Sequence, residues 1–127
     1  MALKNQELGF IKGRMRGGFI AIKGAFLFVT TEHSAMVQFS LAVLMSIAGY
    51  FYHISKVEWM FHVLAFSLLL AVEAANTAIE KLCDFVHEAH HTRIGFIKDV
   101  AAGAVTFAAI GTLIIELLIF IPKVFHS

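Results

Sequence analysis

Four polar side chains in one short segment are spaced so that they could act together on a substrate. Positions i, i+3, i+7 and i+11 of this segment carry Glu73, Asn76, Glu80 and Asp84. At about 100° per residue these positions fall within a stripe roughly 80° wide on one face of a helix. Mg²⁺ is bound by oxygen ligands of this kind together with substrate phosphates. We therefore expect a site for phosphate chemistry in which Glu73 could serve as a base, with a plain water-exposed helix end as the alternative.

Further charged residues flank this stripe in the sequence. Lys98 and Asp99 are expected to open the last helix, where a lysine and the free N–H groups of a first turn would offset phosphate charge. In the alternative interpretation, Lys98 anchors the helix at a membrane surface and Asp99 caps it. Glu32 precedes the first apolar run and could supply a further metal ligand, although a single charge at this position is common.

A histidine-rich loop follows the stripe. His87, His90 and His91 lie close to Glu88, which is a composition that can bind zinc. Because His90 and His91 are adjacent, they are poorly spaced as two ligands on one helix face. A solvated loop is therefore favoured over a zinc site. Cys83 has no base at a diagnostic spacing, so we interpret it as structural.

Three long apolar runs must position these side chains, at residues 35–54, 59–82 and 100–121. Each run is close to the roughly 20 helical residues that cross a hydrocarbon core of about 30 Å. Apolar residues make up 59% of the chain and charged residues 15%, which leaves too little polar surface for a soluble bundle. We predict one domain over residues 1–127, an all-α membrane protein with three transmembrane helices. In the third run, Glu116 is expected to face an oligomer interface, and no role is assigned to it.

The N-terminal segment, residues 1–31, is predicted to be an amphipathic helix lying in the membrane interface. Its apolar side is formed by Phe10, Ile11, Phe19, Ile22 and Phe26. Four glycines oppose this interpretation, since each costs a helix about 1 kcal/mol. These glycines are Gly13, Gly17, Gly18 and Gly24. They indicate either a break in the helix or a close approach of another group to its backbone.

The distribution of basic residues predicts the orientation in the membrane. Five basic residues precede the first run, and three, Lys81, Arg93 and Lys98, lie at or after the end of the second run and before the third. Lys56 and Lys123 are the only basic residues of the other two segments. By the positive-inside rule, the N-terminus and the second loop are cytoplasmic and the C-terminus is outside. The outer half of the second run offers only His62 and Ser67 as polar residues, which argues against a divalent-metal transporter. The net charge of +1 without a basic patch gives no reason to expect nucleic acid as a partner.

The acidic stripe and its surroundings resemble the small prokaryotic diacylglycerol kinase family, which includes the undecaprenol kinases. The resemblance rests on the four-residue motif from Glu73 to Asp84 and on the segment KDVAAGAV that begins at Lys98. Upstream, the pair Lys23–Gly24 and Glu32 also match in spacing, so that the resemblance spans roughly residues 10–123. No Walker motif or Gly-rich kinase loop is present.

This resemblance implies a lipid kinase of the bacterial plasma membrane that transfers the γ-phosphoryl group of MgATP to the hydroxyl of diacylglycerol or undecaprenol. It also implies a homotrimer whose chains each have three membrane helices and an amphipathic N-terminal helix. Glu73 matches the family's general base, and Glu32 and Glu80 match the metal ligands that bridge to ATP. The other implied nucleotide contacts are Asn76, Asp84, His90, His91, Lys98 and Asp99.

The chain also departs from the family pattern at several positions. Many relatives carry an asparagine, a basic residue and a histidine where Ser34, Met36 and Gln38 stand here. Gly17 replaces a common serine, and Ala89 replaces a common acidic residue. These changes bear on nucleotide affinity and on the choice of lipid. A non-catalytic membrane protein of the same fold remains the alternative, although every motif carboxylate is present.

Overall fold

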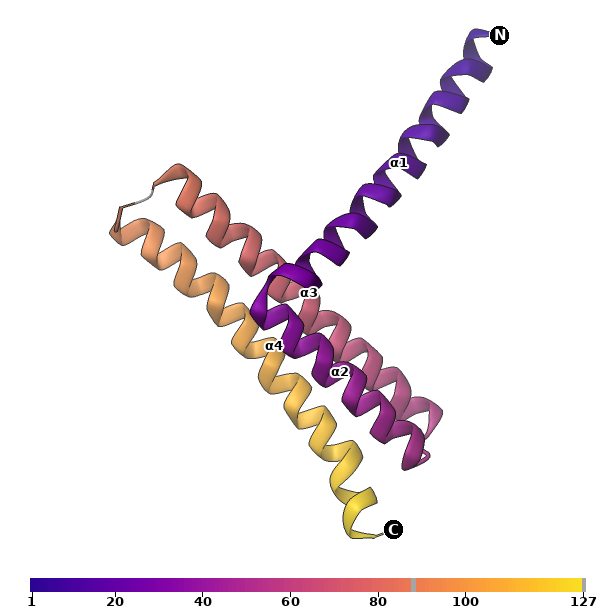
Figure 1. Ribbon diagram of the computed structural model, residues 1–127, viewed down its shortest axis with the longest axis vertical. Helices are drawn as coiled ribbons and strands as arrows, with labels where there is room; N and C mark the ends of the chain where they lie inside the picture. The colour runs from indigo at the N-terminus through magenta and orange to yellow at the C-terminus, as the bar shows by residue number, and fades with distance from the viewer. Residues whose placement is uncertain (88, 127) are drawn as a thin grey trace.

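Four helices make up the chain over residues 1–87 and 89–126, which are the residues that the computed structural model describes (Figure 1). In order, they are α1 (Ala2–Thr31), α2 (His33–Phe51), α3 (Lys56–Val86) and α4 (Thr92–Phe125). Glu88, which the sequence places near the loop histidines, lies outside the described residues. The last three helices are long and apolar enough to cross a membrane. The prediction of an all-α chain with three helices that could span a membrane is confirmed.

The ends of the spans differ from the ends of the apolar runs. α2 stops at Phe51 rather than at residue 54, because the chain turns there and His53 adopts a positive φ of 52°. The Ser55 hydroxyl then accepts a hydrogen bond from the Glu58 N–H at 3.1 Å and so caps α3. α3 and α4 both continue beyond their apolar runs, and α4 extends past Pro122 to Phe125. Hydropathy thus located the spans, whereas the caps determine where the helices end.

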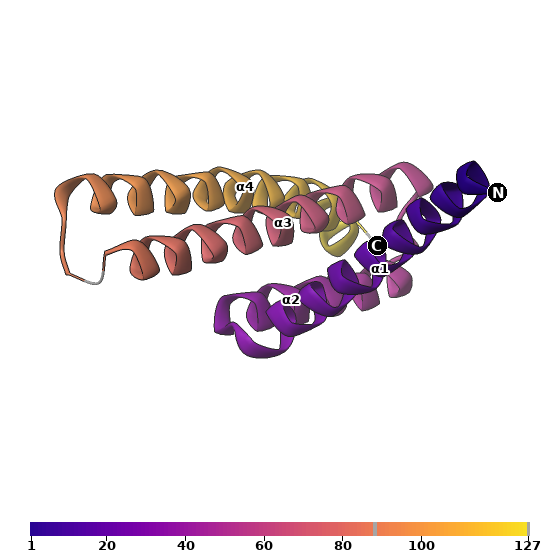
Figure 2. The same ribbon diagram turned by 90° about the horizontal axis from the view of Figure 1, so that it is seen from above.

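The N-terminal segment is one continuous helix that projects away from the other three helices (Figures 1 and 2). The glycines do not break it, and a Cβ atom added at Gly13, Gly17, Gly18 or Gly24 would meet nothing within 4 Å. The predicted break is therefore wrong, whereas the close approach of another molecule to these glycines stays a prediction. No residue of α1 is buried, so its apolar side chains are left free to meet a surrounding surface.

A single residue separates α1 from α2. Glu32 has an extended backbone conformation, with φ −94° and ψ 125°. Its N–H donates to the Phe28 carbonyl at 3.1 Å, and its carbonyl accepts from the Met36 N–H at 3.0 Å. The chain therefore changes direction at Glu32 while both neighbouring helices keep their terminal hydrogen bonds.

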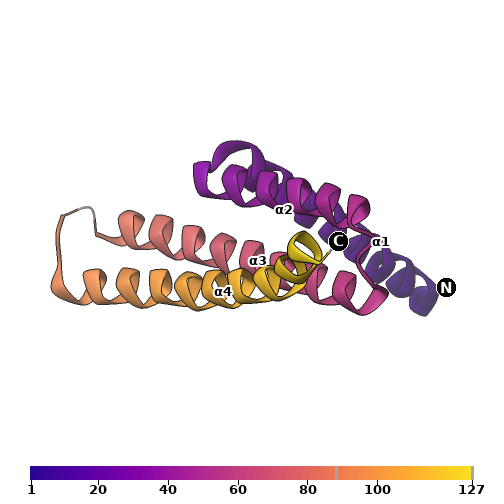
Figure 3. The ribbon, with the colours of Figure 1, turned by 90° about the horizontal axis from the view of Figure 1, so that it is seen from below.

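α3 and α4 form an antiparallel hairpin, and α2 packs against α3 (Figure 3). Where Gly49 lies, an added Cβ would be 2.9 Å from the Ile54 Cδ1 and 3.0 Å from Trp59, so glycine permits the close approach of these side chains. A small apolar cluster at this end contains Ile54, Ile119 and Phe120. In Figure 1 the other end of the hairpin extends past the start of α2. The last turns of α3 and the first turns of α4 form this extension.

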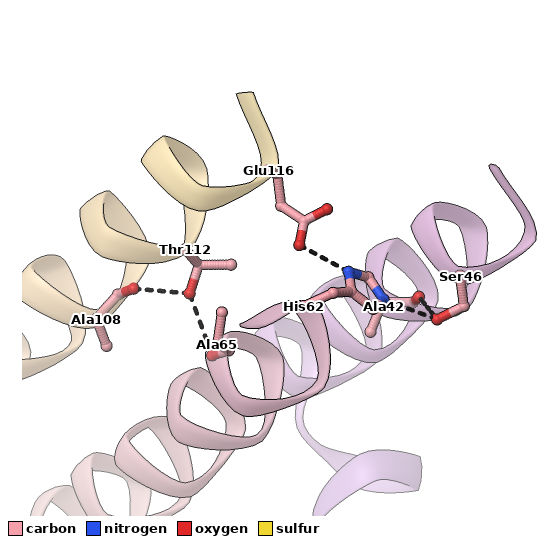
Figure 4. A network of polar contacts seen from close by, with 7 residues as sticks. All are labelled: Ala42, Ser46, His62, Ala65, Ala108, Thr112 and Glu116. Carbon is pink, nitrogen blue, oxygen red and sulfur yellow. Dashed lines mark hydrogen bonds and ion pairs between the residues drawn. The ribbon is translucent and has the colours of Figure 1, made fainter. Parts of the chain in front are cut away.

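A buried polar network joins the three spans (Figure 4). His62 of α3 is 2% exposed, and its Nδ1 lies 2.7 Å from the Glu116 Oε1 of α4. Its Nε2 lies 2.9 Å from the Ser46 Oγ of α2. Since the Ser46 hydroxyl donates to the Ala42 carbonyl at 2.7 Å, Nε2 donates to Ser46 and one proton lies between Nδ1 and Oε1. Glu116 is thus buried against His62 within the chain, and the expectation that it faces an oligomer interface is wrong.

Candidate active site

Glu73 is the buried member of the acidic stripe. It lies on α3 with 6% of its surface exposed, and its Oε2 accepts a hydrogen bond from the Gln38 Nε2 of α2 at 3.1 Å. α2 and α3 run antiparallel, so the first turns of α2 lie beside the second half of α3. A carboxylate with little access to water, held by one amide donor, is suited to accept a proton from a substrate.

The stripe changes from buried to exposed along α3. Asn76 is 8% exposed, and its Nδ2 donates to the Glu80 Oε1 at 3.4 Å. The Asn76 Oδ1 is buried and has no hydrogen-bond partner. Glu80 and Asp84 are both exposed. The helix therefore carries a buried candidate base at one level and accessible carboxylates nearer the α3–α4 loop.

Glu32 reaches the same part of α3 from the junction of α1 and α2. Its Oε1 lies 3.3 Å from the Lys81 Nζ, one residue beyond Glu80. Lys81 was counted in the sequence only for membrane orientation, and its proximity to Glu32 was missed because the two residues are far apart in the chain. The fold thus brings a carboxylate and an ammonium group to the exposed half of the stripe.

Lys98 approaches the stripe from α4. Its Nζ lies 2.5 Å from the Asp84 Oδ1, and both side chains are accessible to solvent. Exposed ion pairs of this kind contribute little to stability, so the main effect of the contact is to place a cation beside the acidic residues. This cation is the chemical group that a phosphorylated substrate would need there.

Lys98 and Asp99 do not open the last helix, contrary to the sequence expectation. α4 begins at Thr92, because the His91 Nδ1 accepts a hydrogen bond from the Arg93 N–H at 3.2 Å and caps the helix. The free N–H groups of the first turn therefore lie well before Lys98. Histidine is an unusual capping residue, and the mean hydropathy rises only later, which is why the start of the helix was placed too far along the chain.

The loop histidines are exposed and interact with one another and with the backbone. The His87 Nδ1 lies 2.7 Å from the Ala89 carbonyl oxygen, and the rings of His87 and His91 meet edge to face at 5.3 Å. Across residues 1–87 and 89–126, no three His, Cys, Asp or Glu side chains gather closely enough to hold a metal ion. This result gives no support to the zinc alternative for the loop.

A magnesium ion fits the oxygen-only donor set at the stripe. Mg²⁺ needs no cluster of three protein ligands, because proteins bind it through one or two carboxylates while phosphates and water supply the rest. Glu32 and Glu80 offer carboxylates, and the orphaned Asn76 Oδ1 is a further oxygen without a partner. The residues present therefore suit a hard cation that arrives together with a phosphorylated substrate.

Comparisons with known proteins agree on one family. Residues 19–120 match the family described as Prokaryotic diacylglycerol kinase. The undecaprenol kinase of Bacillus subtilis (strain 168) is 33% identical to the chain over 120 residues, which are 94% of each protein. The matched region includes every candidate site residue from Glu32 to Asp99. Fold and matches together define an integral membrane lipid kinase. The chain belongs to the prokaryotic diacylglycerol kinase family.

Proposed function

We propose that the chain transfers the γ-phosphoryl group of ATP to the hydroxyl of a long-chain lipid alcohol. The observation that carries this proposal is the buried Glu73 carboxylate in a membrane span, next to an accessible set of carboxylates and lysines. Undecaprenol is our first choice of substrate, because the relative that matches along 94% of the chain is an undecaprenol kinase. Diacylglycerol, which gives the family its name, is the second.

Glu73 is the general base in this proposal. It takes the proton of the lipid hydroxyl while the hydroxyl oxygen forms a bond to the γ-phosphorus and the bond from that phosphorus to the leaving oxygen of ADP breaks. The burial of Glu73 matters because a dry carboxylate favours transfer to the lipid over transfer to water. Lys98, held beside Asp84, and Lys81, beside Glu32, supply positive charge towards the phosphates.

Glu32 and Glu80 are the proposed ligands of Mg²⁺. When bound, the metal offsets the negative charge of the transferred phosphoryl group and of the leaving phosphates. The Asn76 Oδ1, which has no hydrogen-bond partner, lies one helical turn from Glu80 and is a further oxygen for the proposed metal site. The remaining nucleotide contacts that we propose are Asn76, Asp84, His90, His91, Lys98 and Asp99.

The protein is proposed to act as a homotrimer in the bacterial plasma membrane, with its active site at the cytoplasmic face. Positive charge supports this orientation, since most basic residues lie in α1 and around the α3–α4 loop. α1, in which no residue is buried, would lie along the membrane surface as an amphipathic helix. Glu80 and Asp84 are exposed in the single chain, which leaves room there for a nucleotide and a neighbouring subunit.

A phosphorylation assay tests the proposed function. The purified protein in mixed micelles is incubated with labelled ATP, MgCl₂ and either undecaprenol or diacylglycerol. We expect label in the lipid fraction with both alcohols and a higher kcat/KM for undecaprenol. A higher kcat/KM for diacylglycerol would reverse the choice of substrate. Absence of label in either lipid, with folded protein, would remove the kinase proposal for these alcohols.

The metal assignment predicts a changed dependence on magnesium. Glu32→Ala and Glu80→Ala should each raise the Mg²⁺ concentration needed for half-maximal activity, because each removes a carboxylate from a hard-cation site. The double variant should cost much less than the product of the two single effects, since ligands of one ion act as a unit. Activity is titrated against MgCl₂, with Glu7→Ala on the exposed α1 as the matched control. Identical titration curves for both single variants and the control would contradict the assignment.

A further inference from the structure

Gln38 is the residue that contacts the candidate base from another helix. In the described part of the chain, the Glu73 side chain has one hydrogen bond, which comes from the Gln38 Nε2 at 3.1 Å. The other polar atom of the same amide, the Gln38 Oε1, is buried and has no partner. The Nε2 of the Gln38 amide therefore donates to Glu73, whereas its Oε1 is an acceptor without a hydrogen bond.

An amide suits a base that changes its protonation state. Before proton transfer, the Glu73 carboxylate can only accept hydrogen bonds, and after the transfer its carboxyl group carries an O–H that must donate. A glutamine side chain offers a donor and an acceptor, and turning the amide exchanges the two. An apolar side chain at this position could bond to neither state, and a carboxylate would repel the ionised base.

We propose that Gln38 is a positioning residue for the base, with Nε2 orienting the Glu73 carboxylate and Oε1 accepting a hydrogen bond from the carboxyl O–H that Glu73 carries after transfer. This proposal rests on the proposed function of Glu73. The proton moves from the lipid hydroxyl to Glu73, is held in the hydrogen bond to the Gln38 Oε1, and leaves to water when the product departs. The buried, unpartnered state of Oε1 is explained by its use in the second half of the cycle.

A purely structural role for Gln38 would have different consequences. α2 is also joined to α3 by the hydrogen bond between Ser46 and His62 and by the close packing of Gly49 against Ile54 and Trp59. Loss of the Gln38 amide therefore leaves α2 attached at its other end. A residue that only attached α2 would change stability, whereas a positioning residue changes turnover in a folded protein.

Kinetics of substituted proteins test the proposal. Gln38→Met keeps the side-chain length and removes both hydrogen-bonding groups, and Gln38→His keeps one donor and one acceptor nitrogen. We expect Gln38→Met to lower kcat by about 10- to 100-fold, with KM for lipid and ATP changed by less than about twofold. Gln38→His should recover most of the lost kcat. Ser40→Ala, at an exposed position on the same helix, is the matched control and should retain normal kinetics.

A spectroscopic readout separates this proposal from the proposed function. The infrared carboxylate band of Glu73, assigned by its loss in Glu73→Gln, should shift in Gln38→Met and stay unchanged in Ser40→Ala. Gln38→Leu replaces the methionine variant if the latter does not assemble. An unshifted band, or a normal kcat in Gln38→Met, would overturn the role of Gln38. If the unsubstituted protein phosphorylates no lipid, the proposed function fails and the band alone decides the contact between Gln38 and Glu73.

Discussion

Replacement of Glu73 by glutamine should lower the turnover of lipid phosphorylation at least about a hundredfold, which is the lower bound usual for the loss of a general base. The glutamine is nearly isosteric and neutral, so it fits the same buried position on α3 but cannot take the proton of the hydroxyl. Initial rates at saturating ATP and lipid measure the effect. Thermal unfolding of the same preparation shows whether the variant is folded.

The matched control for this substitution is Glu7→Gln on α1, where the side chain is exposed and takes no part in the proposed chemistry. It should retain normal turnover. A folded Glu73→Gln protein with near-normal turnover would end the assignment of Glu73 as the base. The fold and the family membership would be unaffected by that result.

The second large effect is expected on stability. Glu116→Leu should lower the free energy of unfolding by about 3–5 kcal/mol, because it leaves His62 buried without its partner. His62→Leu should have a similar cost, because it leaves Glu116 buried without its partner. The double variant should recover most of the loss, since apolar side chains of similar volume often replace a buried polar pair without net cost.

Denaturant titrations in detergent micelles, followed by far-ultraviolet circular dichroism, measure these differences. Ser67→Ala is the matched control, because Ser67 lies on the same helix at an exposed position. If the double variant has a free energy of unfolding as low as that of either single variant, or lower, the residues stabilise the protein through packing and not through the contact between His62 and Glu116.

The spans and the acidic stripe were predictable because they depend on local patterns. A run of apolar residues identifies a membrane helix from its length, and the spacing from Glu73 to Asp84 defines one face of α3 whatever surrounds it. The continuous α1 was less predictable. Each glycine disfavours the helix locally, whereas the hydrogen bonds of a long helix can outweigh the cost of several glycines. The start of α4 was missed because its cap is the side chain of His91.

The contacts between helices could not be derived from these patterns. Gln38 and Glu73 are 35 residues apart, and His62 and Glu116 are 54 residues apart. Such pairs depend on the register of two helices, which is determined by side-chain packing along the whole interface. One signal for the second pair was present, since His62 lies near the start of one apolar run and Glu116 near the end of the next. In antiparallel neighbours these positions have similar depth.

The pairing of His62 with Glu116 has a consequence for membrane insertion. Each residue lies in a different span, and a charged side chain alone at the centre of a bilayer costs about 2.5–3.5 kcal/mol on insertion scales. If α3 entered the membrane by itself, His62 would be there without Glu116. If α4 entered by itself, Glu116 would be there without His62. Entry of the two helices as a connected hairpin avoids both costs. The polar pair therefore favours insertion of α3 and α4 together over insertion of either helix alone.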